Sequence, residues 1–398
     1  MDIETALTLA KENAPYLSRL IDANIISSYN AEDLLDTIKA CLAPLPADSL
    51  TSDLMARLRQ DKARLHLALA LLDLSGNLKL HDVTSYITQF ADRCCEIALR
   101  HALTKNHCGD DGLTLFALGK MGAHELNYSS DIDMAAFFDV DVFRGGARDP
   151  GDAASRAVRE AMRILSERTA DGYVFRTDLR LRPDPSSTPL AVSTRRADLY
   201  YESVGQNWER MVWIKGRPAA GDMHVGEAFV KTLEPFVWRK HLDYWAIADV
   251  QAIKGMINAR AGDADLVNQA PDLKLGPGGI REIEFFVQTQ QIILGGRNPS
   301  LRVPGTLEGL ESLVELDVVA RETANDLSDS YEMLRRVEHR IQMLNDEQTH
   351  TLPSFEAQRA RVAARSGFSD LDAFDTAILE TRRLVHHHYI ALFANVAR

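Results

Sequence analysis

Hydrophobic side chains in the N-terminal part of the chain recur every three or four residues, which is the spacing that places them on one face of an α-helix. In the segment that opens at Leu50-Thr51-Ser52-Asp53, these positions are Leu54, Leu58, Leu65, Leu69 and Leu72. The segment from Ser85 to Leu99 continues the pattern with Ile87, Phe90, Cys94 and Ile97. We therefore predict a helical region over residues 1–105.

The pattern changes at the Gly- and Asp-rich segment 109–112. Residues 113–118 and 132–138 are short apolar runs, which are typical of buried β-strands. Residues 173–181 alternate between polar and apolar side chains and predict a third strand. A small sheet is therefore expected in the middle of the chain.

Helical spacing returns on both sides of the third predicted strand. Asp152 is expected to cap one helix, which Gly172 closes, and Ser193 is expected to cap another. The second helix carries an apolar and aromatic stripe at Tyr200, Tyr201, Val204, Trp208, Met211 and Val212. From residue 226 the pattern is helical to the end, most clearly at Leu327, Tyr331, Leu334, Val337, Ile341 and Leu344.

These patterns together predict a predominantly helical α+β fold. We expect an N-terminal helical region over residues 1–105, a small sheet core with inserted helices over residues 106–260, and a C-terminal helical bundle over residues 261–398.

Composition and charge narrow the classes of protein that fit this fold. The chain is 45% hydrophobic and 26% charged, as soluble proteins are, and its net charge of −12 argues against a broad nucleic-acid-binding face. No apolar run reaches the roughly 20 residues of a membrane helix, and the N-terminus does not resemble a secretory signal. Four cysteines without a CxxC pair or a framework spacing fit reduced thiols. We therefore expect a cytoplasmic protein that binds neither nucleic acid nor membrane.

Candidate chemistry begins at the second predicted strand. The turn Leu118-Gly119-Lys120-Met121-Gly122 leads through Ser130 to Asp131-Ile132-Asp133. Residues two apart on a strand share a face, so the two carboxylates project together, and Mg²⁺ is the usual cation that relieves their repulsion. Gly119 and Ser130 are expected to shape a turn whose backbone approaches a phosphate.

The third predicted strand adds a further carboxylate and several arginines. Alternation places Arg176, Asp178, Arg180 and Arg182 on one face. A salt-bridged surface strand is the simpler interpretation. However, three cations around one anion leave an excess of positive charge, and phosphate oxygens can accept bidentate hydrogen bonds from arginine. Phosphoryl-group transfer by a two-metal mechanism needs carboxylates that hold two metal ions and cations that bind phosphate. The two predicted strands supply three carboxylates and a cluster of arginines.

The same segments carry a family resemblance. Leu118–Asp133 resembles the pattern of the polymerase-β-like nucleotidyltransferase superfamily, in which a glycine turn precedes a DxD strand. Four longer segments resemble the bacterial glutamine synthetase adenylyltransferase/adenylyl-removing enzyme, namely residues 118–134, 174–193, 200–222 and 274–310. The resemblance implies a polymerase-β-like sheet core flanked by helices.

The resemblance also implies a reaction. That enzyme has two similar halves: one attaches AMP from ATP to a tyrosine of glutamine synthetase, and the other removes it by phosphorolysis and releases ADP. The present chain has one core, as a truncated or stand-alone half would, and GGIREIEF (278–285) and NAPYL (13–17) resemble the N-terminal, adenylyl-removing half. Removal of the adenylyl group is therefore the expected activity. Adenylylation from ATP, or a non-catalytic module that binds glutamine synthetase or the PII signalling protein, are the alternatives.

By the same resemblance, Asp131 and Asp133 match the metal-binding pair and Asp178 the third carboxylate, so that all three would be catalytic and would hold two Mg²⁺ ions. Phosphate and ADP, or ATP, would be the small substrates, glutamine synthetase the protein substrate, and PII a partner of the full-length enzyme.

Four basic residues are expected to meet phosphate. Arg180 and Arg182 would neutralise charge that develops in the transition state. Lys215 and Arg217 close the predicted aromatic helix and would add phosphate contacts, or else only complement the helix dipole.

Overall fold

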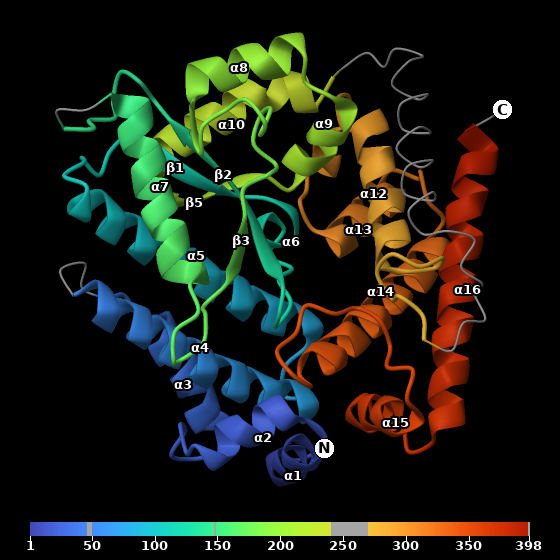
Figure 1. Cartoon of the computed structure of the whole chain (residues 1–398). Coiled ribbons are helices and arrows are strands. Elements are labelled where there is room, and N and C mark those ends of the chain that lie inside the picture. The colour runs from blue at the N-terminus through green and yellow to red at the C-terminus, as the bar shows by residue number, and fades with distance from the viewer. Residues whose placement is uncertain (46–49, 147–148, 240–269, 397–398) are drawn as a thin grey trace. The chain divides into compact units, whose positions relative to one another are not determined.

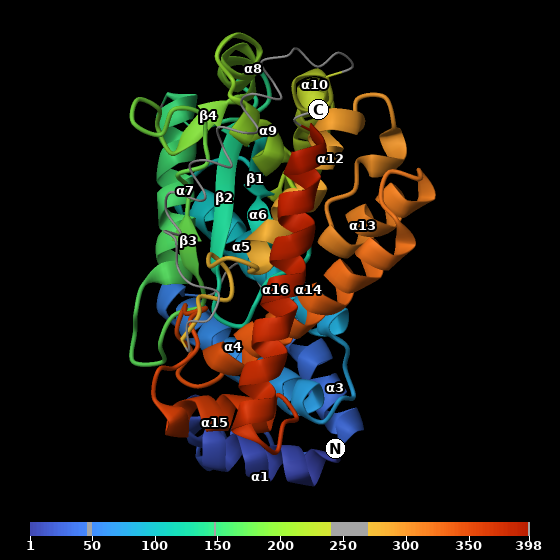
Figure 2. The same ribbon diagram turned by 90° about the vertical axis from the view of Figure 1, so that its right-hand side faces the viewer.

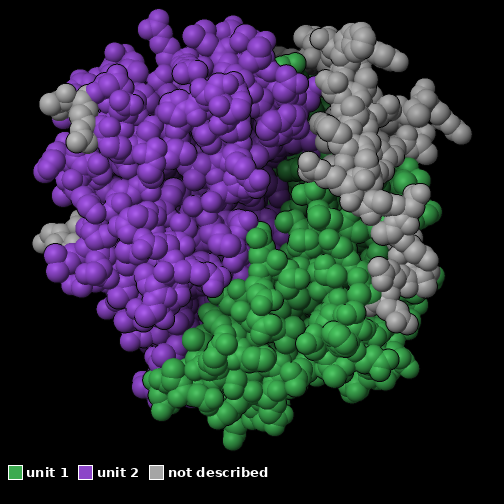
Figure 3. All heavy atoms as spheres, in the orientation of Figure 1, with its two compact units in different colours: residues 1–24, 70–80, 239–398 green, residues 25–69, 81–238 purple. Residues whose placement is uncertain are grey.

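The computed structural model describes residues 1–45, 50–146, 149–239 and 270–396 (Figure 1). The chain forms two compact units, coloured separately in Figure 3. Unit 1 comprises residues 1–24, 70–80 and 239–398, and unit 2 comprises residues 25–69 and 81–238. This division differs from the three expected regions, because the N-terminal helices contribute to both units. The expected boundary at residue 260 lies outside the described residues.

Unit 2 is built on a five-stranded mixed sheet. Its strands are β1 (Leu113–Ala117), β2 (Asp131–Phe138), β3 (Arg176–Asp178), β4 (Ala191–Ser193) and β5 (Arg217–Gly221). β1 lies between β2 and β5 and is antiparallel to both, whereas β3 and β4 pair in parallel with the first and last parts of β2. All of β1 is buried, and in β2 only Asp131 and Asp133 are partly exposed, so the first two predicted strands are confirmed as buried strands.

Helices surround this sheet. Unit 2 holds α3 (Ala31–Leu42), α6 (Gly119–Gly122), α7 (Pro150–Ser166), α8 (Thr194–Ser203), α9 (Asn207–Ile214), α10 (Met223–Val237), and most of α4 (Thr51–Leu74) and α5 (Leu80–Lys105). α7 packs on β2, β3 and β4, and α10 packs on β1 and β5. An aromatic core joins sheet and helices, with ring centroids 5.4 Å apart for Phe116 and Phe137 and 4.7 Å apart for Phe137 and Phe229.

Two predicted helices begin or end differently in the structure. Asp149, not Asp152, caps α7, because Pro150 occupies the first helical position and the Asp149 side chain accepts from the Asp152 backbone N–H. Ser193 caps α8 as predicted, but the expected single helix is divided into α8 and α9. The division lies at Gly205, where a Cβ atom would overlap the Phe236 ring.

The third predicted strand is much shorter than expected. β3 covers only Arg176–Asp178, because the Asp178 carboxylate accepts a hydrogen bond of 2.8 Å from the backbone N–H of Arg180 and so closes a turn. Such local side-chain bonds compete with sheet pairing. β4 and β5 were not predicted; β5, with the sequence RPAAG, has no strand-like alternation.

Unit 1 is a helical assembly. In the described residues its helices are α1 (Ile3–Asn13), α2 (Pro15–Asp22), α12 (Ile280–Leu294), the short 3₁₀ helix η1 (Pro299–Leu301), α13 (Thr306–Glu315), α14 (Arg321–Gln342), α15 (Glu356–Arg365) and α16 (Leu371–Val396). α16 packs against α12, α14 and α15, as Figure 2 shows. The predicted stripe of α14 is confirmed at Leu327, Tyr331, Leu334, Val337 and Ile341, which are all buried. Leu344, the last predicted position, lies beyond the end of α14 and is only partly buried.

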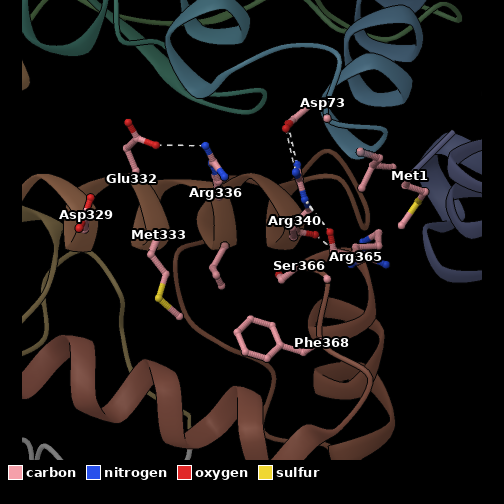
Figure 4. Close-up of a pocket in the computed structure, with 14 residues that line it drawn as sticks. Met1, Asp73, Asp329, Glu332, Met333, Arg336, Arg340, Arg365, Ser366 and Phe368 are labelled. Carbon is pink, nitrogen blue, oxygen red and sulfur yellow. Dashed lines mark hydrogen bonds and ion pairs between the residues drawn. The ribbon is translucent and has the colours of Figure 1, made fainter. Parts of the chain in front are cut away.

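A buried ion pair joins two distant segments of unit 1. Asp73, near the end of α4, receives hydrogen bonds of 2.6 and 2.8 Å from the guanidinium of Arg340 on α14, and both side chains are 6% exposed. Burial raises the pKa of Asp73, but the charge and hydrogen bonds of Arg340 outweigh it and hold this pKa well below its usual range. Figure 4 shows the pair beside a cavity of about 400 Å³, which the more exposed Glu332–Arg336 pair also borders.

Removal of one partner of this pair should destabilise unit 1. Asp73→Ala leaves the Arg340 charge buried and uncompensated, which is expected to cost about 3–5 kcal/mol. The matched control is Glu332→Ala on α14, the helix that carries Arg340. Its exposed pair with Arg336 is worth roughly 0.2–0.5 kcal/mol. Native-state hydrogen exchange of the α14 amides measures both. An equal effect of the two variants would contradict a dominant role for the buried pair.

Candidate active site

Two of the three predicted carboxylates are neighbours where β2 and β3 pair, and the third lies two positions away on β2. In this parallel register Asp131 lies opposite Arg176, and Asp133 lies opposite Asp178. Asp131 precedes Asp133 by two positions and therefore projects from the same face of β2. Asp178 is thus a lateral neighbour of Asp133 in the sheet.

Arg176 fixes the position of Asp131. Its Nε donates to Asp131 Oδ1 at 2.6 Å, its Nη1 to the Tyr173 hydroxyl at 2.5 Å, and its Nη2 to the Ser129 carbonyl at 2.8 Å. All three guanidinium nitrogens are therefore engaged by protein groups. We expected Arg176 on a phosphate-facing surface, but the register assigns it to the carboxylate.

Arg180 pairs with Asp178 but remains largely in solvent. Its Nη2 lies 2.5 Å from Asp178 Oδ2, and 84% of its side chain is exposed. Hydrogen bonds from the Arg180 side chain lower the pKa of Asp178 and keep it ionised. The pKa of Arg180 is raised mainly by its hydrogen bond to Asp178, and also by the charges of Asp133 and Asp131, so this one guanidinium lies within the field of all three carboxylates.

Arg182 does not share this face. Because β3 ends at Asp178, the predicted alternation stops there, and Arg182 lies in the following loop. Its guanidinium donates to four backbone carbonyls of that loop, those of Leu179, Pro185, Thr188 and Pro189. The expectation that alternation brings Arg182 beside Arg180 is wrong, and its observed role is to hold the loop.

The predicted glycine turn reaches the carboxylates directly. Gly119 begins α6 with φ of +54°, and a Cβ atom there would lie 2.8 Å from Asp133 Oδ2. Both facts favour glycine at this position, because a side chain would be strained and would press on the carboxylate. The Leu118 backbone N–H also donates to the Asp133 carbonyl at 2.9 Å, and Ser130, partly exposed, directly precedes β2.

Lys215 and Arg217 contact protein groups in and around this turn. The Lys215 ammonium donates to Glu125 at 3.0 Å in a pair whose side chains are 6% and 13% exposed. Arg217, the first residue of β5, binds Asp92 at 2.8 and 2.9 Å. Burial raises the pKa of Asp92 to about 6, against the opposing charge of Arg217.

Arg217 also donates to the carbonyls of Met121 and Gly122, at the C-terminal end of α6. The charge of Arg217 therefore complements the dipole of α6. The alternative interpretation had assigned this role to the predicted aromatic helix instead. Asp92 and Glu125 had not been singled out. Asp92 lies 125 positions from Arg217, so no local pattern connects the two.

The donor chemistry of the carboxylates suits Mg²⁺, which prefers oxygen ligands. Among the described residues, however, no group of three or more His, Cys, Asp or Glu side chains is arranged to hold a metal ion. Asp131 and Asp178 are instead engaged by Arg176 and Arg180. The carboxylates would have to turn from these arginines to share a cation, and the metal assignment stays a prediction.

Within the described part of the chain, no helix combines the length and the apolar character needed to cross a bilayer.

Comparison with known proteins adds to this geometry. A family model described as glutamate-ammonia ligase adenylyltransferase matches residues 6–232, and one described as GlnD PII-uridylyltransferase matches residues 251–393. Relatives in Agrobacterium fabrum, Caulobacter vibrioides and Bartonella quintana are 47%, 46% and 43% identical, over 91%, 96% and 99% of this chain. Each is a bifunctional glutamine synthetase adenylyltransferase/adenylyl-removing enzyme.

The matched regions cover 38%, 41% and 42% of these three relatives, so the chain spans about two fifths of their length. The first family model alone covers more than half of the 398 residues and includes every carboxylate and arginine of the candidate site. The chain therefore belongs to the glutamate-ammonia ligase adenylyltransferase family.

Proposed function

We propose that this chain is an adenylyl-removing half: it transfers the adenylyl group from a modified tyrosine of glutamine synthetase to inorganic phosphate, which gives ADP and the free tyrosine. The observation that carries the proposal is the register that sets Asp133 beside Asp178, with Asp131 and Arg180 close by. The resemblance of residues 13–17 and 278–285 to the N-terminal half supports this direction.

In the proposed reaction a phosphate oxygen attacks the phosphorus of the adenylyl group, and the bond from phosphorus to the tyrosine oxygen breaks. Mg²⁺ held by Asp131, Asp133 and Asp178 would supply charge neutralisation at the phosphate oxygens. Arg176 keeps Asp131 oriented through the hydrogen bond from Nε to Oδ1. The guanidinium of Arg180 pairs with Asp178 and its side chain is 84% exposed, so it can turn toward an incoming phosphate without breaking a buried contact.

The turn at Gly119 provides the other wall of this site. Without a side chain at Gly119, backbone atoms approach Asp133 closely, and backbone N–H groups of such a turn could bind a phosphate group. The protein is asked for little covalent chemistry, because positioning and charge stabilisation account for most of the catalysis in phosphoryl transfer.

Adenylylation from ATP is the second candidate. It is favoured by the name of the matching family, and the same carboxylates would serve either direction. The match of residues 251–393 to a PII-uridylyltransferase model supports the PII signalling protein as a partner of the full-length enzyme.

Direction can be tested with the chain itself. Adenylylated glutamine synthetase and inorganic phosphate should yield ADP in a phosphate-dependent reaction, and EDTA should abolish it if divalent ions are required. Enzyme-coupled detection of ADP measures this. Pyrophosphate release from ATP with unmodified glutamine synthetase, without ADP formation in the first assay, would establish the adenylylation candidate instead.

Loss of one carboxylate should remove most of the activity. Asp133→Asn keeps the shape of the side chain but not its charge, and the loss of several kcal/mol of charge stabilisation predicts a rate reduced by roughly 100-fold or more. Circular dichroism should show an intact fold. Asp141→Asn, in the exposed loop after β2, is the matched control and should retain activity. Near-normal activity of Asp133→Asn would exclude this site.

The two neighbouring arginines should behave differently. Arg180→Ala is expected to lower kcat roughly 10- to 100-fold with little effect on stability, because the side chain is 84% exposed. Arg182→Ala removes a donor shared by four carbonyls and should cost about 1–3 kcal/mol of stability. Steady-state kinetics and thermal unfolding of both variants test this contrast. The reverse pattern would show that Arg182 is the phosphate ligand.

A further inference from the structure

The C-terminal end of α6 is held by an ion pair from outside the turn. Arg217 on β5 donates to the Met121 carbonyl at 3.1 Å and to the Gly122 carbonyl at 3.3 Å. The same guanidinium is fixed by Asp92 on α5 through hydrogen bonds of 2.8 and 2.9 Å. The two side chains are only 22% and 23% exposed, so water competes weakly for these contacts.

Close packing leaves α6 little freedom at this end. A Cβ atom at Gly122 would overlap the Lys215 carbonyl, so the turn lies directly against the segment that leads into β5. The buried Lys215–Glu125 pair ties the residues after α6 to the same segment. The turn is thus attached to its support by two ion pairs and by direct backbone contact.

The opposite end of α6 contacts the candidate active site. Gly119 lies so close to Asp133 that a Cβ atom would be 2.8 Å from the carboxylate oxygen. With a rise of 1.5 Å per residue, the four residues of α6 span only about 6 Å, so a shift at Gly122 is transmitted to Gly119. A helix of this length has no stability of its own, and its position must come from tertiary contacts.

We propose that Asp92 and Arg217 are positioning residues for the reaction: their ion pair fixes α6 and thereby the wall that Gly119 forms beside Asp133. Neither residue touches the reacting atoms in this role. The inference rests on the proposed function for its catalytic consequence, whereas the fixing of the turn is independent of it.

Two measurements on the full chain test the proposal. The first is hydrogen exchange at Gly122, Ala123 and Glu125, whose backbone N–H groups are bonded within the turn. Arg217→Gln and Asp92→Asn should each accelerate this exchange at least tenfold, while the amides of β1 and β2 remain protected. Unchanged exchange in both variants would overturn the proposal, whether or not the chain proves to be an adenylyl-removing enzyme.

The second measurement is phosphate-dependent ADP release from adenylylated glutamine synthetase. Misplacement of the turn should lower kcat at least tenfold and change the KM for phosphate less than threefold. Because Asp92 acts through Arg217, Asp92→Asn should add little to the defect of Arg217→Gln in the double variant. Arg217→Lys, which keeps the charge, should recover part of kcat.

Lys105→Gln is the control, since it removes a more exposed ion pair, between α5 and Glu160 on α7 in unit 2, and it should leave both measurements unchanged. Faster hydrogen exchange in the turn with a normal kcat in the Arg217 and Asp92 variants would overturn the positioning role. Absence of ADP release from the unmodified chain would instead refute the proposed function, and the exchange result would still decide whether the pair fixes the turn.

Discussion

The parallel pairing of β2 with β3 is the constraint on which the rest of the candidate site depends. It brings mutually repelling carboxylates together at Asp133 and Asp178, which is unfavourable unless cations compensate. Three residues of strand provide few backbone hydrogen bonds, and Arg176 adds to them by joining β3 to Asp131 and to the Ser129 carbonyl. Arg176 on β3 therefore both pairs with the Asp131 carboxylate and holds the short strand against β2.

Parallel pairing also explains the architecture around the site. Two parallel neighbours cannot be joined by a tight turn and need a long crossover connection, which here contains α7. That helix packs on β2, β3 and β4, and its buried face includes small residues at Ala153, Ala157 and Ala161 that permit close approach to the sheet. The position of Asp178 beside Asp133 is thus a consequence of how α7 covers the sheet.

Local pattern was sufficient to predict β1, β2 and the shared face of Asp131 and Asp133, because burial and alternation act over a few residues. The length of β3 was not predicted, since its end depends on whether Asp178 bonds to the next backbone N–H or continues the sheet. The ion pairs that hold α6 could not be predicted from local sequence patterns. Arg217 meets a carboxylate 125 positions away, and Lys215 meets one 90 positions away.

The same limit explains why the arginines were harder to assign than the carboxylates. An aspartate on a strand has its direction set by the pleat, but a long guanidinium turns to whichever acceptors lie within reach. Arg182 reaches four carbonyls, and Arg217 reaches three carbonyls and a carboxylate, so their donors are already engaged by the protein. Arg180 pairs with Asp178 and is mostly exposed. Such an exposed guanidinium is little positive charge for a phosphate and an adenylyl phosphorus together, which favours divalent cations as the main compensating charge in the proposed reaction.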